Sequence, residues 1–113
     1  MTDRMSHDDY VRSCRTRAAE IAAAVLAGTL PLLEGCHLLD ELRSGVKVPD
    51  NDPDFAVFNL VQSETDTLPV GRVSQHWAAA ALASAEAELQ SAAEWAGPIA
   101  LPACESVSAR FGA

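Results

Sequence analysis

The chain has 113 residues, of which 49% are hydrophobic, and a formal net charge of −8. This length predicts a single domain over residues 1–113, large enough to fold without a metal ion or a disulfide. A strongly negative protein repels nucleic acid and anionic membrane surfaces, so we expect neither as a partner.

The composition also predicts the fold class. Alanine supplies much of the apolar fraction, whereas aromatic residues make up only 5% of the chain. Alanine is the best helix former and a poor strand residue. We therefore expect an all-α fold, an irregular bundle of four main helices plus a short one.

Two helices are expected in the N-terminal part of the chain. Ser6 followed by Asp9 has the form of a capping box, and the helical spacing of apolar residues after it runs to Gly28. Glycine is a common helix terminator, so the first helix should end there. Thr29 is a suitable cap for a second helix, which we expect to end at Gly45.

The acidic segment at residues 50–54 introduces the third helix. It resembles a calcium-binding loop but lacks the glycine and the glutamate that such loops require. Asp52 as the N-cap and Pro53 in the first helical position are a better explanation. A short strand at residues 55–61 is the alternative, although the sequence offers no good second strand to pair with it.

The segment 63–71 combines acids and turn formers more densely than any other part of the chain. Pro69 restricts its own backbone and that of its predecessor, and Gly71 permits a positive φ. We expect a rigid turn that holds Glu64 and Asp66 in place. Fixed carboxylates of this kind suit the recognition of a basic partner, but they are also found in ordinary capped loops.

A helix over residues 78–96 has the clearest periodicity in the sequence, with small apolar residues along one face. Gly97 and Pro98 should break it, and a last helix should begin at Pro98 or Pro102. A stripe of small residues allows close helix packing, either within the domain or against a second copy. A structural homo-oligomer, such as a homodimer, therefore remains an alternative.

The residues that could carry chemistry form no catalytic signature. Three cysteines cannot all pair within the chain, and each lies among apolar residues, so we expect buried, reduced thiols in a cytoplasmic protein. The sequence contains no phosphate-binding loop, no zinc motif and no nucleophile elbow. We predict no enzymatic activity, no cofactor and no metal.

Several segments follow one another in a recognisable order. They are Gly28-x-x-Pro31-Leu32-Leu33-Glu34-Gly35, then Asp52-x-Asp54-Phe55, then Ser63-Glu64-Thr65-Asp66-x-Leu68-Pro69-x-Gly71, and finally Trp77. This order resembles the pattern of an uncharacterised family of small bacterial helical proteins, over about half of the chain. The resemblance implies a compact, largely helical cytoplasmic protein, loosely associated with the immunity partners of bacterial toxins. It supplies no catalytic residues.

The distribution of charge favours a binding function. Nine acidic residues but only two basic ones follow Val48. Our main hypothesis is a small acidic protein-binding module, an immunity-type protein that neutralises a basic toxin domain. The expected contact residues are Glu64, Asp66, Asp50, Asp52, Asp54 and, as an apolar anchor, Trp77.

A pocket for a metal ion or a small molecule, in an enzyme-like helical domain, is the alternative hypothesis from another class. Glu34 and His37 are three residues apart and so share one face of a helix. They would line the pocket together with Glu64, Asp66 and His76. Only one such Glu-x-x-His pair is present, whereas di-iron bundles use two.

Overall fold

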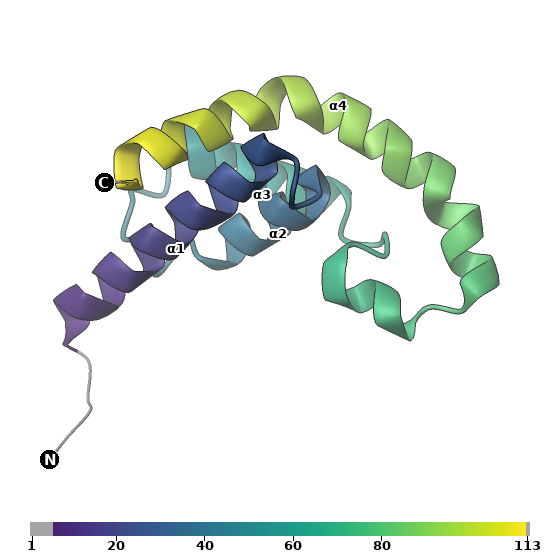
Figure 1. Cartoon of the computed structure of the whole chain (residues 1–113), viewed down its shortest axis with the longest axis horizontal. Helices are drawn as coiled ribbons and strands as arrows, with labels where there is room; N and C mark the ends of the chain where they lie inside the picture. The colour runs from purple at the N-terminus through teal and green to yellow at the C-terminus, as the bar shows by residue number, and fades with distance from the viewer. Residues whose placement is uncertain (1–5, 113) are drawn as a thin grey trace, which may run out of the picture.

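The structure, a computed structural model, describes residues 6–112 except for the side chains at positions 72 and 73. Its elements in chain order are α1 (His7–Ala27), α2 (Leu32–Glu41), α3 (Pro53–Glu64), the 3₁₀-helix η1 (Gly71–His76) and α4 (Ala79–Phe111) (Figure 1). Between residues 6 and 112 the chain forms no strand, and residues 55–61 lie in a helix. The predicted all-α fold is confirmed.

The caps of α1 and α3 follow the sequence. The Ser6 side chain accepts a hydrogen bond from the Asp9 amide, and Gly28 ends α1 with a positive φ of 81°. Asp52 caps α3 by accepting from the Phe55 amide at 3.2 Å, with Pro53 in the first helical position. These short-range capping interactions depend on a few adjacent residues, so the sequence predicts them well.

The limits of α2 differ from the prediction. The helix begins at Leu32 and ends at Glu41, and the Thr29 hydroxyl donates to the Ala24 carbonyl at the end of α1. Gly45 lies in the following turns, where a Cβ atom would come within 2.5 Å of the Cys14 sulfur. Glycine at this position permits close approach to α1, and the predicted helix end at Gly45 is wrong.

The expected break at Gly97 and Pro98 is wrong, because α4 continues through both internal prolines to Phe111. Pro98 and Pro102 are exposed, so the carbonyls that lose their amide partners lie on the outer side of the helix. The buried face of α4 continues past them through Ala100, Ala103, Cys104 and Val107. Packing on the inner face therefore maintains one bent helix, seen as an arch in Figure 1.

The core lies beneath the C-terminal half of α4, where this half packs on α1 and α3 (Figure 1). Phe55 and Phe58 are fully buried and meet edge to face, with ring centroids 5.3 Å apart. The N-terminal half of α4 and η1 extend beyond this core on one side and the start of α1 on the other, along the longest dimension of 50 Å (Figure 1). No helix in the described part of the chain has the length and apolarity needed to cross a membrane.

Candidate interaction surface

An acidic corner, Glu64 to Asp66, lies where α3 ends. Thr65 is only 1% exposed, and its hydroxyl donates to the Val61 carbonyl at 2.7 Å. The same oxygen lies 2.6 Å from His37 Nε2 on α2 and therefore accepts from it. Because Thr65 is anchored inward, its two acidic neighbours are exposed. Among the described residues, neither of these carboxylates forms a hydrogen bond or an ion pair.

The turn that follows is held by its own backbone and by burial. The Leu68 amide donates to the Thr65 carbonyl at 3.0 Å, and the Val70 amide donates to the Leu68 carbonyl at 2.8 Å. Pro69 and Val70 are buried, and Gly71 has a positive φ of 64°. The acidic corner is therefore followed by a turn with the hydrophobic underside expected from the sequence.

Two hollows lie between this turn and the N-terminal half of α4. The α3 notch, of about 400 Å³, is lined by Glu64, Thr67, Leu68, Ala87, Glu88, Ser91 and Ala92. The α2 notch, of about 430 Å³, lies against the start of α2 and includes Glu34, Pro69, Val70 and Glu86. No lysine or arginine among the described side chains lines either hollow. Each notch thus receives one glutamate from α4 and one from a facing helix.

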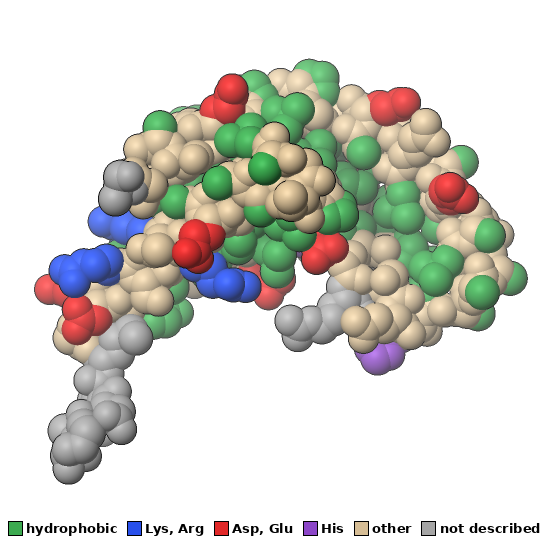
Figure 2. All heavy atoms as spheres, viewed as in Figure 1, with side chains coloured by type: hydrophobic (Ala, Val, Ile, Leu, Met, Phe, Trp, Pro, Cys, Tyr) green, Lys and Arg blue, Asp and Glu red, His purple; other side chains and the backbone are tan. Residues whose placement is uncertain are grey.

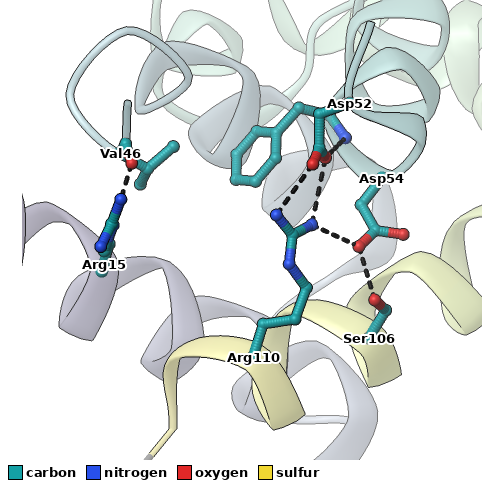
Figure 3. A network of polar contacts seen from close by, with 7 residues as sticks. Arg15, Val46, Asp52, Asp54, Ser106 and Arg110 are labelled. Atoms are coloured by element: carbon teal, nitrogen blue, oxygen red, sulfur yellow. Dashed lines mark hydrogen bonds and ion pairs between the residues drawn. The ribbon is translucent and has the colours of Figure 1, made fainter. Parts of the chain in front are cut away.

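Asp52 and Asp54 have a different environment, at the opposite end of α3 (Figure 3). Arg110 on α4 donates to Asp52 Oδ1 at 2.8 Å and to Asp54 Oδ2 at 2.8 Å. Ser106 also donates to Asp54 Oδ2. Burial acts to raise the pKa of Asp52, but hydrogen bonds from Arg110 and from backbone amides outweigh it and lower the pKa. These two carboxylates connect α3 to α4 through Arg110, unlike Glu64 and Asp66 at the other end of α3.

The other two expected contact residues, Asp50 and Trp77, lie apart from Glu64 and Asp66 in the chain. Asp50 is exposed in the turn before α3, separated from Glu64 by the length of that helix, roughly 18 Å. Trp77 is half-buried at the junction of η1 and α4. The structure therefore brings Asp50 close to the start of α3 and leaves Glu64 and Asp66 together at its end.

The structure does not bring the set proposed for a metal or small-molecule pocket into one hollow, and Asp66 and His76 line none of the hollows described here. Glu34 and His37 line a cavity of about 710 Å³ together with Arg17, Glu41 and Gln75. Glu64 lines the α3 notch instead. Across the described residues, no three histidine, cysteine, aspartate or glutamate side chains are placed to hold one metal ion.

The three thiols are buried and unpaired. Burial raises the pKa of Cys36 to about 12 and that of Cys104 to about 11. A thiol with so high a pKa carries almost no thiolate at neutral pH. Cys36 and Cys104 therefore act as core residues.

Sequence reasoning did not identify the glutamates that α4 contributes to the notches. Glu86 and Glu88 flank the small apolar residues of the predicted helix over 78–96, but the sequence does not say which helices face each other. The structure places Glu88 beside Glu64 and Glu86 beside Glu34 in the two hollows. The one indication in the sequence is that Glu86 and Glu88 lie on either side of the residues that form the inward-facing side of α4.

Comparison with protein-family models, with curated proteins and with solved structures gave no match to this chain. The resemblance carried by the 63–71 motif therefore remains a prediction.

Proposed function

We propose that this protein is a small acidic binding module of the immunity type, which neutralises a basic toxin domain by docking against it. The observation that carries the proposal is the outward orientation of Glu64 and Asp66 on either side of the buried Thr65. Both carboxylates are held on an ordered turn, and among the described side chains neither has a cationic partner. A basic protein would supply that partner.

Two physical effects favour such an encounter. The net charge of −8 accelerates association with a positively charged protein by long-range attraction. The hydrogen bonds of Thr65 and the backbone bonds of the following turn order the corner before binding, which reduces the entropy lost on docking. Glu88 adds a third carboxylate beside Glu64 in the α3 notch.

A protection assay in cells tests this proposal. The gene adjoining that of this protein is expressed with and without it, and cell survival is measured. We expect the wild-type chain to rescue cells from a basic toxin encoded there. The double variant Glu64→Lys/Asp66→Lys should lose protection, because it places two cations where the toxin needs anions.

The matched control is Glu94→Lys/Glu105→Lys, which changes the net charge equally at two exposed sites of α4 outside the corner. It should protect as well as the wild type does. Equal protection by both double variants would remove Glu64 and Asp66 from the site. Absence of both protection and binding in the wild type would overturn the proposed function itself.

A further inference from the structure

Helices α3 and α4 lie antiparallel to each other, with contacts at both ends. At one end, Arg110 of α4 binds Asp52 and Asp54 at the start of α3 (Figure 3). At the other end, Glu64 of α3 and Glu88 of α4 line the same notch. Moving from Glu64 toward the N-terminus of α3 therefore follows the same direction in space as moving from Ser91 toward the C-terminus of α4.

One turn beyond the notch, each of the two helices carries an exposed hydrophobic side chain. Leu60 lies one turn before Glu64, and Trp95 lies one turn after Ser91, so each is roughly 6 Å from the notch along its helix. Both side chains are 44% exposed. Leu60 shares a face of α3 with Glu64, and Trp95 shares a face of α4 with Ser91 and Glu88.

We propose that these residues form one docking surface, the α3–α4 seam, which binds a basic amphipathic helix of the partner. The seam comprises Leu60, Glu64, Glu88, Ser91 and Trp95. Trp95 and Leu60 provide its apolar centre, and the two glutamates bind cations on one flank of the incoming helix. This inference rests on the proposed function and specifies which element of the basic partner is recognised.

A helix is the element that fits this surface. The chain forms no strand between residues 6 and 112, so it offers no sheet edge to which an extended peptide could add. Amphipathic helices instead dock through apolar residues on one face, and the seam offers the notch together with two exposed hydrophobic side chains. Tryptophan is the residue most often found as the main energetic anchor of such contacts.

Electrostatics favours a basic helix over a second copy of this chain. A symmetric dimer through the seam would place Glu64 and Glu88 of one copy close to those of the other. The cost of bringing these like charges together adds to the repulsion between two molecules of net charge −8. A lysine-rich helix has no such cost, because its charges complement those of the seam.

Titration calorimetry with a synthetic peptide tests the inference. The probe is an amphipathic helical peptide of leucine and lysine, and its comparison peptide has the same composition in an order that breaks the leucine stripe. We expect the wild-type protein to bind the amphipathic peptide at least tenfold more tightly than the scrambled one. Raising the salt concentration should weaken this binding.

The variants distinguish binding at the seam from nonspecific attraction of the basic peptide to an acidic protein. Trp95→Ala should weaken binding of the amphipathic peptide about thirtyfold, and Glu88→Lys about tenfold. The controls are Leu101→Ala, which removes another exposed hydrophobe of α4, and Glu105→Lys, which makes the same charge change elsewhere on that helix. Both controls should bind within about twofold of the wild type.

Three results would overturn the inference: no preference for the amphipathic peptide, wild-type affinity in Trp95→Ala, or a wild-type dimer that Trp95→Ala converts to a monomer. The proposed function is judged separately in the protection assay. If Glu64→Lys/Asp66→Lys loses protection while Trp95→Ala and Leu60→Ala retain it, the function stands and the seam is wrong. If the wild type gives neither protection nor binding to a basic partner, the proposed function fails.

Discussion

The two ends of α3 carry the same kind of residue in opposite circumstances. At its start, Asp52 and Asp54 are bound by Arg110, and Asp52 is only 7% exposed. At its end, Glu64 is exposed and lines an open notch. At the start of α3, α4 presents the cation Arg110, so Asp52 stabilises the fold. At the end of α3, α4 presents another glutamate, Glu88, so Glu64 remains available to a partner.

Packing differs along α4 in the same way. Five of its six buried residues, namely Ala96, Ala100, Ala103, Cys104 and Val107, lie in its C-terminal half. The N-terminal half buries only Ala85, and Figure 2 shows hydrophobic side chains on the inner side of the arch there. Burial of apolar area is the main source of stability, so we expect the free energy of unfolding to depend chiefly on the C-terminal half and the helices beneath it.

The largest effect is expected in the core. Phe58→Ala should lower the free energy of unfolding by about 3–5 kcal/mol, because it removes a fully buried ring and leaves a cavity. Leu60→Ala is its control on the same helix; since Leu60 is 44% exposed, the change should stay within about 0.5 kcal/mol. Chemical denaturation measures both, and similar losses would mean that the seam is part of the core.

The next largest effect concerns the ion pairs at the start of α3. Arg110→Ala should cost about 1.5–3 kcal/mol, because it leaves the buried carboxylate of Asp52 without its charged donor. The comparison is Arg12→Ala, which removes an exposed pair with Asp9 and should change stability by less than about 1 kcal/mol. Equal effects in denaturation curves would mean that the Arg110 pairs stabilise the fold no more than an exposed ion pair does.

The sequence predicted the local features of the fold because short-range chemistry determines them. Ser6, Gly28 and Asp52 each act through neighbours within a few residues, and all three have the expected roles. The continuity of α4 depends instead on α1 and α3, which bury its inner face on both sides of Pro98. No local pattern at Gly97 and Pro98 contains that information.

The residues of the candidate interaction surface were also predictable only where local sequence determines them. The residues of segment 63–71 predict a turn, but they leave open whether Glu64 and Asp66 are exposed or act as caps. The structure shows both side chains exposed. In the sequence, Asp52 and Asp54 are candidate contact residues just as Glu64 and Asp66 are. Their ion pairs with Arg110, more than fifty residues later in the chain, show that they stabilise the fold. Glu88 was missed for the same reason, since its neighbour Glu64 lies on another helix.

A pair of glycines tests the rigidity of the turn beside the acidic corner. Gly71→Ala should cost about 1–2 kcal/mol, because φ is +64° and the new Cβ would lie 3.2 Å from Cγ of Glu34. Gly97→Ala in α4 meets no atom within 4 Å and should stabilise by about 0.5–1 kcal/mol. Thermal unfolding compares them, and stabilisation by both would show that the turn tolerates a side chain.

The smallest effect is expected from His37, which connects α2 to the acidic corner through Thr65. Burial lowers the pKa of His37 from its ordinary 6.5, and the carboxylates of Asp40, Glu41 and Asp66 only partly offset this. A lowered pKa means that the unfolded chain binds a proton at a pH where the folded chain does not. This contribution to stability is therefore complete above pH 6.5 and is lost as the pH falls below it.

The prediction is a decline in the free energy of unfolding as the pH falls below 6.5, which His37→Gln should reduce. Gln retains an amide donor but cannot take up a proton, so it removes the titration while keeping the polar character of the site. His76→Gln, at an exposed position of η1, should leave the decline unchanged. If the free energy of unfolding of His37→Gln fell as steeply with pH as that of the wild type, protonation of His37 would not be the cause of the decline.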